Sequence, residues 1–156
     1  MRINQKSMSS KKVMLITGAT AGIGRAVADH YYKKNCKLIL TGSAKEKIEK
    51  LNKKFKKNTL AIQANLTETN DIKKIISLSL DKFKKIDVLI TNAGLYEPDK
   101  IISGNPDRWD RVIKVNVTSV FTIVNVIWRS IKKNKCVDQN DKLGLSKLAY
   151  NFLGGV

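Results

Sequence analysis

Few of the residues that build metal centres and catalytic triads are present in this sequence. Histidine occurs once, at His30, and cysteine twice, at Cys36 and Cys136. A single histidine nearly excludes a histidine-based metal site or a Ser–His–Asp triad, so no metal is expected. The two cysteines have neither zinc spacing nor Cys-x-x-Cys spacing, which favours reduced thiols in a cytoplasmic protein.

Long apolar runs are also lacking. No segment approaches the length needed to cross a bilayer. The N-terminus, MRINQKSMSSKK, is basic and polar and has no apolar region typical of a secretory signal. We therefore expect no membrane partner and a flexible tail over residues 1–10. A chain of 156 residues fits one domain, which we place at 11–156.

Acidic residues are scarce compared with basic ones. The sequence has 13 Asp and Glu against 30 Lys and Arg, and its formal net charge is +17. Such a charge is compatible with a nucleic-acid or other acidic partner. The lysines are spread along the chain, however, in KEKIEKLNKKFKK, DIKK, KFKK and SIKKNK, and several are spaced as the solvated faces of helices. This spread favours a lysine-rich solvated surface and makes a nucleic-acid partner the weaker alternative.

Short apolar runs alternate with segments of helical periodicity from residue 11 onward. Buried strands are predicted over KKVMLITG (11–18), CKLILTG (36–42), TLAIQA (59–64) and IDVLITNAG (86–94). Helices are predicted through AVADHYYKK, KEKIEKLNKKF, DIKKIISLSLDKF and the long segment WDRVIKVNVTSVFTIVNVIWRSIKK. Strands that are apolar on both faces and alternate with helices are typical of a parallel sheet covered on both sides. The predicted fold class is therefore α/β, a doubly wound, Rossmann-like parallel sheet.

Two helix starts carry capping signals. Thr67 and Thr69 offer N-caps for the third helix. Asn105 and Pro106 offer a cap and a first-turn proline for the long helix.

A glycine-rich loop joins the first strand to the first helix. Gly18, Gly22 and Gly24 form Gly-x-x-x-Gly-x-Gly, which would allow a tight turn, a close approach to a pyrophosphate and close helix packing, respectively. The amides near Ile23 would point at the phosphates. A glycine turn without a ligand is the alternative, but the strand before the loop and the helix after it favour a dinucleotide site. The Gly-Lys-Ser/Thr of an ATPase phosphate loop is absent, because Arg25 follows the last glycine.

Four motifs, in order, resemble those of the short-chain dehydrogenases/reductases. They are TGATAGIG (17–24), ANL (64–66), TNAG (91–94) and RVIKVNV (111–117). The resemblance covers nearly all of residues 12–133. It implies an NAD(P)-dependent oxidoreductase that interconverts small-molecule carbonyls and alcohols by hydride transfer, and a 3-oxoacyl carrier-protein reductase is one activity it suggests.

The resemblance also assigns roles to individual residues. The pyrophosphate and ribose would be bound by Thr17, Gly18, Thr20, Gly22, Ile23 and Gly24. The adenine would be lined by Asn65, where the family usually has Asp, and by Leu66, and the cofactor would be contacted after the fourth strand by Asn92, Ala93 and Gly94. Asn116 would hold a water of a proton relay at a helix kink. From the residues alone, Asn92 can be a turn residue as well as a site residue. For Asn116, the residues alone favour a satisfied polar residue inside a helix.

The end of the second strand bears on the choice of cofactor. NAD sites place an acid there, which accepts a hydrogen bond from the ribose 2′-hydroxyl. Here the position holds Gly42, followed by Ser43, Lys45 and Lys47. A hydroxyl and nearby ammonium groups would attract a 2′-phosphate. NADP(H) is therefore predicted over NAD(H), although the family's NADP-binding arginines are absent, with Ala21 inside the glycine loop.

The proton-transfer residues of the family are incomplete in this sequence. Its members use Ser, Tyr and Lys, with Tyr-x-x-x-Lys on one helix face. In LGLSKLAYNFL, Lys147 fits the lysine that would lower the tyrosine pKa and bind ribose, but Leu143 stands at the tyrosine position. Tyr150 has no lysine four residues later. The segment CVDQND is too polar and too short for the strand that carries the family's serine, and Ser130 belongs to the long helix by pattern.

Three functions stay open. The first is an oxidoreductase of this family in which catalysis is impaired, so that we expect weak or no turnover. The second is a non-catalytic dinucleotide-binding protein or gene fragment, and the third is a basic protein that binds nucleic acid.

The family's later strands are absent, so we expect a sheet that is C-terminally incomplete. Family members associate through the helix that carries Asn116 and the next helix; only the start of the latter is present, which makes a homo-oligomer doubtful.

Overall fold

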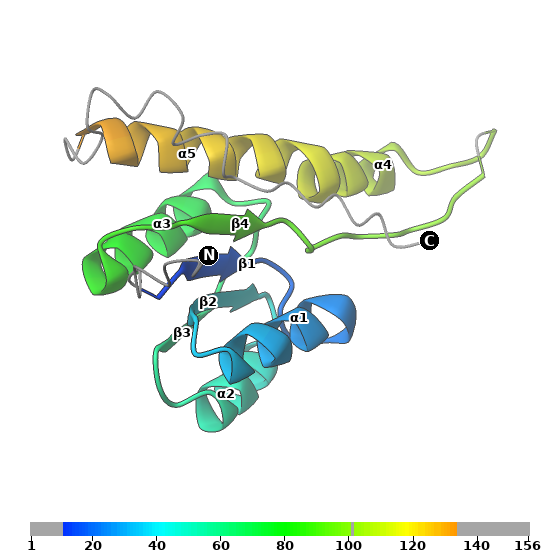
Figure 1. The fold of residues 1–156 in the computed structure, drawn as a ribbon. Helices are drawn as coiled ribbons and strands as arrows, with labels where there is room; N and C mark the ends of the chain where they lie inside the picture. The colour runs from blue at the N-terminus through cyan, green and yellow to red at the C-terminus, as the bar shows by residue number, and fades with distance from the viewer. Residues whose placement is uncertain (1–10, 101, 134–156) are drawn as a thin grey trace, which may run out of the picture.

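The computed structural model describes residues 11–100 and 102–133, which form a parallel sheet with helices on both faces (Figure 1). The strands are β1 (Val13–Ile16), β2 (Lys37–Gly42), β3 (Thr59–Gln63) and β4 (Val88–Ile90). The helices are α1 (Gly22–Lys33), α2 (Lys45–Lys54), α3 (Thr69–Phe83), α4 (Pro106–Ile113), the π-helical turn η1 (Lys114–Thr118) and α5 (Ser119–Lys133). The strand order is β3-β2-β1-β4 and every pairing is parallel, so the predicted doubly wound sheet is confirmed.

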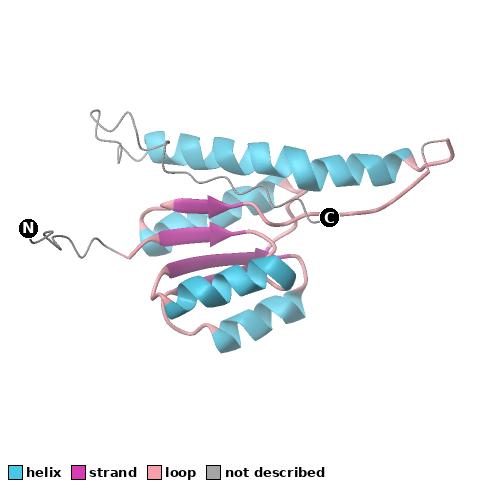
Figure 2. Cartoon of the chain, turned by 45° about the vertical axis from the view of Figure 1, so that its right-hand side comes forward, coloured by secondary structure: helices cyan, strands magenta, loops and turns pink. Residues whose placement is uncertain are grey.

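The strands are apolar on both faces because each face is covered by helices, as Figure 2 shows. Side chains alternate across a strand. Val13 and Leu15 of β1 therefore pack with residues of α3 and α5, whereas Met14 and Ile16 pack with residues of α1 and α2. Two apolar cores result, one on each side of the sheet, and β1 contributes to both.

The start of α3 differs from the prediction. Its N-cap is Glu68, whose side chain makes no capping hydrogen bond, and Thr69 is the first helical residue. The hydroxyl of Thr67 donates to Glu68 instead of capping the helix. Thr67 and Thr69 are therefore not caps. The carboxylate of Asp71, in the first turn, accepts from the backbone N–H of Asn65 at 2.7 Å, which ties the helix start to the end of β3.

The start of α4 agrees with the prediction. Asn105 is the N-cap, and its side-chain oxygen accepts from the backbone N–H of Asp107 at 2.8 Å. Pro106 occupies the first turn, where its missing N–H leaves no bond unmade. The helix therefore begins at a fixed place and direction after a long loop.

The helical run from α4 through α5 is the longest in the described part of the chain. By length and composition alone, its 25 residues from Pro106 to Ser130 could cross a membrane. The expectation that no apolar segment reaches that length was therefore wrong for this helix. Only 17% of the apolar window is buried: Ile123 and Ile127 pack in the core shared with α3, whereas Phe121 is 71% exposed.

Candidate functional site

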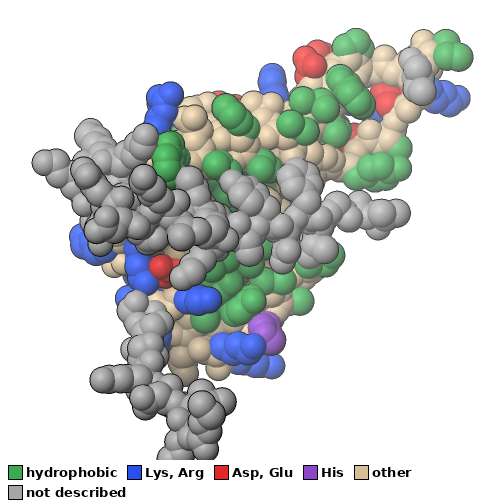
Figure 3. All heavy atoms as spheres, turned by 45° about the horizontal axis from the view of Figure 1, so that its top comes forward, with side chains coloured by type: hydrophobic (Ala, Val, Ile, Leu, Met, Phe, Trp, Pro, Cys, Tyr) green, Lys and Arg blue, Asp and Glu red, His purple; other side chains and the backbone are tan. Residues whose placement is uncertain are grey.

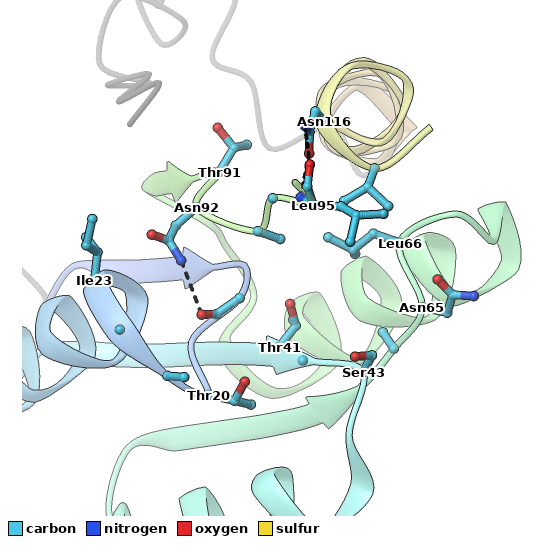
Figure 4. A pocket seen from close by; sticks show the side chains of 18 of the residues that line it. Thr20, Ile23, Thr41, Ser43, Asn65, Leu66, Thr91, Asn92, Leu95 and Asn116 are labelled. Atoms are coloured by element: carbon cyan, nitrogen blue, oxygen red, sulfur yellow. Dashed lines mark hydrogen bonds between the residues drawn. The ribbon is translucent and has the colours of Figure 1, made fainter. Parts of the chain in front are cut away.

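A cavity of about 800 Å³ opens at the carboxyl ends of the strands (Figure 4). These ends meet at one edge of the sheet because the strands are parallel, which is where ligands bind in folds of this kind. The residues from the sequence motifs that line it are Gly18, Thr20, Gly22, Ile23, Ser43, Asn65, Leu66, Asn92, Ala93, Gly94 and Asn116. Four motifs that are far apart in the sequence therefore line one cavity.

Two of the predicted site residues are placed differently, and a third is not described. Thr17 is 1% exposed and does not line the cavity. Its Oγ1 accepts from the backbone N–H groups of Asn92 (3.1 Å) and Ala93 (3.0 Å), so it joins the end of β1 to the end of β4. Gly24 is buried on the inner side of α1. Lys147 lies outside the described residues.

Glycine is needed at the three loop positions for different structural reasons. Gly18 adopts φ +63°, and a Cβ there would lie 2.8 Å from the Cα of Ala93. Gly22 adopts φ +52°, and a Cβ there would meet nothing within 4 Å. At Gly24, a Cβ would lie 2.4 Å from Nδ2 of Asn92 and 2.5 Å from the oxygen of Gly18. Gly18 and Gly24 are therefore required by packing, whereas Gly22 leaves an open approach to its backbone.

The side-chain amide of Asn92 holds the glycine loop against the end of β4. Its Nδ2 donates to the carbonyl oxygens of Thr17 and Gly18, each at 3.2 Å. Figure 4 marks one of these bonds by the dashed line from Asn92. Gly18 lies in the turn between β1 and α1, so regular secondary structure supplies no partner for its carbonyl. Asn92 supplies that partner, so both readings of this residue, turn residue and site residue, describe part of its position.

Asn116 lies in the π-helical turn η1, where π-turns often mark functional sites. Its Oδ1 accepts from the backbone N–H of Leu95 at 2.8 Å, and its Nδ2 donates to the oxygen of Leu95 at 2.9 Å. These two bonds fix the chain just after the Asn-Ala-Gly motif. Asn116 is thus a satisfied polar residue at the wall of the cavity, and its role toward a relay water stays a prediction.

The end of β2 offers no carboxylate to the cavity. A Cβ at Gly42 would lie 2.4 Å from Cγ2 of Thr20, so an acid at this position would require Thr20 to move. Ser43 is exposed and lines the cavity, whereas Lys45 and Lys47 do not line it. The predicted attraction of a 2′-phosphate therefore depends on the Ser43 hydroxyl among the residues that line the site.

Asn65 and Leu66 line the cavity beyond the end of β3. The Oδ1 of Asn65 accepts from the backbone N–H of Thr67 at 3.1 Å, a turn in which the amide Nδ2 is the donor left for a ligand. An Asp at this position would keep the same turn but would offer no donor. The Asn therefore changes what this part of the cavity can bind.

Two threonines that sequence reasoning did not assign to the site also line the cavity. Thr41, at the end of β2, is 1% exposed, and Thr91, after β4, is 8% exposed. Within the residues that the structure describes, neither Oγ1 has a hydrogen-bond partner. Buried hydroxyls are normally paired, so these two are unsatisfied donors facing a cavity. Thr91 opens the TNAG motif and Thr41 directly precedes Gly42, and these positions were the only signals in the sequence.

The wall opposite the glycine loop is apolar. Leu95, Val115 and Val120 line it, together with Tyr96, which is 83% exposed. Sequence reasoning did not single out these four: Leu95 and Tyr96 directly follow the TNAG motif, and within RVIKVNV only Asn116 was assigned a role.

The cavity itself is electrically neutral. None of the described residues that line it is charged, and the first turn of α1 has no acidic residue. An anion there would meet backbone N–H groups and the positive end of the α1 dipole. The site is therefore suited to phosphate groups that are bound by backbone amides.

The loop between β4 and α4 is held by two carboxylates. Asp99 accepts from the backbone N–H groups of Asn105 (2.8 Å) and Lys100 (2.9 Å), and these bonds hold the pKa of its carboxyl below the ordinary value. Glu97 forms an ion pair with Arg111 of α4. Both contacts fix the loop that follows the cavity wall.

Comparison with known sequences places the chain in a family. The profile of the short chain dehydrogenase family matches residues 12–136. A 3-oxoacyl-(acyl-carrier-protein) reductase of Buchnera aphidicola subsp. Acyrthosiphon pisum is 32% identical over 126 residues, which are 81% of this chain and 52% of that protein. The corresponding protein of Escherichia coli is 26% identical over 124 residues, 80% of this chain and 51% of that one. The chain thus spans about half the length of the curated relatives it matches.

Comparison with solved structures gives the same result. The 3-ketoacyl-(acyl-carrier-protein) reductase of Brucella melitensis, solved in complex with NADH, superposes with a TM-score of 0.73 at 29% identity. The match covers 80% of this chain and 52% of that one. Family profile, sequence relatives and structure agree, and the chain belongs to the short-chain dehydrogenase family.

Proposed function

We propose that the cavity binds a nicotinamide dinucleotide and that the chain is part of the machinery of a carbonyl–alcohol oxidoreductase. The observation that carries the proposal is the neutral cavity at the strand ends, with two unsatisfied hydroxyls and an open approach to Gly22. Each of these features leaves a polar group or a space that a dinucleotide would use.

The pyrophosphate would lie against the glycine loop. Gly22 has space where any other residue would place a Cβ, and the amides at the start of α1 are the donors nearest to it. Asn92 holds the loop in this shape through two carbonyls. The loop is thus organised by contacts within the protein before any ligand arrives.

The ribose and adenine would lie over the ends of β2 and β3. Ser43 would donate to a 2′-phosphate, and the side chain of Thr20 fills the place of an NAD-type acid beside Gly42. Asn65 would donate its amide to the adenine. NADP(H) is therefore our preferred cofactor over NAD(H).

When bound, the cofactor would supply or accept the hydride at its nicotinamide. Transfer of the proton requires a hydroxyl near the substrate oxygen. At the position of the family's tyrosine this chain has Leu143, which has no hydroxyl. Lys147 would still bind the ribose. We therefore propose slow turnover or none in this chain, and a 3-oxoacyl thioester as the substrate class, from the printed names of the relatives.

The second candidate is a dinucleotide-binding protein without catalysis, which Leu143 favours. Oxidation of NADPH by a 3-oxoacyl thioester separates the two functions. We expect the parent chain to be almost inactive and Leu143→Tyr to gain about 100-fold or more, the usual contribution of a general acid.

The control is Leu143→Phe, which adds the ring without the hydroxyl. An equal gain in the Phe variant would show that the phenol is not the proton donor. No gain with Tyr in a chain that binds NADPH would favour the non-catalytic function.

A second prediction concerns the unsatisfied hydroxyl of Thr41. Thr41→Val keeps the shape of the side chain and removes a donor that has no protein partner. We expect unchanged or slightly higher stability to urea, and an NADPH affinity lower by about fivefold, the value of one net hydrogen bond.

Thr59→Val is the matched control. Thr59 is also a buried strand threonine, but its hydroxyl donates to the oxygen of Lys57 at 3.2 Å, and it lies at the start of β3, away from the cavity. For Thr59→Val we expect lower stability to urea and an unchanged affinity for NADPH. A Thr41→Val variant that loses stability and keeps its affinity would remove Thr41 from the site.

A further inference from the structure

The fold gathers lysines that are spread along the sequence. The segments 11–12, 33–37, 53–58 and 82–87 hold twelve lysines and one carboxylate, that of Asp87. Each segment immediately precedes a strand, and the strands are parallel, so all four segments lie at the same end of the sheet. We call this surface the basic face. In Figure 3, several Lys and Arg side chains (blue) lie at the left, beside residues drawn in grey, and others are spread over the rest of this view.

Backbone hydrogen bonds fix the proximity of these segments. The N–H of Lys37 donates to the oxygen of Lys12 at 2.9 Å, and the N–H of Leu38 donates to the oxygen of Asn58 at 2.8 Å. The N–H of Asp87 donates to the oxygen of Val13 at 2.8 Å. The lysine segments are therefore neighbours across the sheet, in the order of the strands.

The lysines on this face far outnumber the carboxylates that pair with them. The ammonium groups of Lys37 and Lys82 lie 5.7 and 5.6 Å from the centroid of the same ring, Phe83. Two carboxylates compensate part of this charge: Asp87 pairs with Lys85 at 2.9 Å and accepts from the N–H of Val13 at 2.7 Å, and Asp29 of α1 pairs with Lys54 at 2.6 Å. Like charges gathered at one end of the sheet repel one another, and an approaching polyanion would relieve that repulsion.

Helix ends account for only part of this arrangement. Lysines in the last turns of α1, α2 and α3 are favoured by the helix dipole. Lys12, Lys37, Lys56 and Lys57 lie outside helices, so the dipole does not explain them. A separate reason is needed for the rest of the face.

The chemistry of the surface selects one class of partner. Every exposed residue in the four segments is lysine or asparagine, and Phe55 and Phe83 are buried. Protein interfaces are depleted in lysine and need an apolar centre, and helices that bind membrane surfaces need an exposed apolar side. The face has no arginine for bidentate recognition, only point charges. We propose that the basic face binds the phosphate backbone of nucleic acid without sequence preference.

This site is separate from the cavity. The cavity lies at the carboxyl ends of the strands and the basic face at their amino ends, so the two occupy opposite edges of the sheet. The proposal therefore does not depend on the dinucleotide site.

The test measures binding of the full chain to a short fluorescein-labelled DNA duplex of random sequence, by anisotropy over a series of salt concentrations. With four or five phosphates neutralised, the plot of log K against log salt should have a slope of about −4, at about 0.9 per phosphate. Replacing Lys12, Lys33, Lys56 and Lys57 by Gln should reduce that slope to near zero and weaken binding at least tenfold. All four are exposed.

A matched variant replaces Lys47, Lys50, Lys73 and Lys74 by Gln. These lysines are exposed on α2 and α3, outside the basic face, and the variant has the same net charge as the first. It should bind the duplex nearly as well as the parent. Equal weakening in both variants would mean that overall charge drives binding, and would overturn the proposal.

Two further arms complete the test. Saturating NADPH should leave the duplex bound, and displacement would place the DNA in the cavity and overturn the proposal. Binding to phosphatidylserine vesicles but not to DNA at the same salt concentration would also overturn the proposal. A lack of binding to DNA at low salt would overturn it too.

Discussion

Gly24→Ala is expected to destabilise the protein and to remove most of its affinity for NADPH. The new methyl would lie 2.4 Å from Nδ2 of Asn92 and 2.5 Å from the carbonyl oxygen of Gly18. Neither atom can give way freely, since Asn92 is held by two carbonyls and Gly18 is backbone. Overpacking of this kind costs about 1–3 kcal/mol, and we expect the upper part of that range in urea unfolding. NADPH affinity, measured by fluorescence titration, should fall at least tenfold, because α1 must move away from the loop.

Gly22→Ala is the matched variant. A Cβ at Gly22 meets no protein atom within 4 Å, so only its left-handed φ of +52° is strained, at about 1–2 kcal/mol. Stability should fall less than in Gly24→Ala, but affinity should fall as much, because the methyl occupies the approach to the backbone. A Gly22→Ala protein that binds NADPH as tightly as the parent would rule out a pyrophosphate at this glycine.

Asn92→Asp is expected to have the second large effect. The substitution keeps the shape of the side chain but turns a donor into a carboxylate oxygen facing the carbonyls of Thr17 and Gly18. Two hydrogen bonds are lost and two acceptors are left opposed to a charge, so we expect a loss of about 3 kcal/mol in urea unfolding. The added negative charge at the phosphate loop should lower NADPH affinity further.

Asn65→Asp is the control for charge alone. It adds the same charge to the lining of the same cavity, but its carboxylate would keep the bond from the backbone N–H of Thr67 and would oppose no carbonyl. We expect a change in stability below about 0.5 kcal/mol, as for most surface substitutions. If the two Asp variants lost equal stability, the Asn92 amide would not be holding the loop.

Much of the fold could be predicted because apolar pattern and glycine position report local constraints. All four residues of β1, VMLI, are apolar and buried, so both faces of the strand are covered. Burial on both faces is typical of a strand in a parallel sheet. The spacing of the glycines predicts that Gly18 and Gly24 are needed in the loop, and in the structure a Cβ at either position would lie too close to neighbouring atoms. The Asn105 cap and Pro106 likewise act within one turn, so the sequence alone reveals them.

Other features depend on what lies next to a residue in space. Thr67 and Thr69 have capping side chains, but the end of β3 engages Asp71 and sets the start of α3 at Glu68. Thr41 and Thr91 read as ordinary strand residues, and only the cavity beside them makes their hydroxyls unusual. The spread of the lysines favoured a solvated surface, whereas the parallel topology gathers twelve of them at one edge.

The central claim is that the cavity at the strand ends binds a nicotinamide dinucleotide. The most direct test is a titration of the purified full chain with NADPH and with NADH, followed by fluorescence and by thermal unfolding. We predict a cooperative transition that both nucleotides raise and NADPH raises more, with a stabilisation of about 2.7 kcal/mol at a concentration 100 times its Kd. A cooperative transition that neither nucleotide shifts, with no change in fluorescence, would contradict the account.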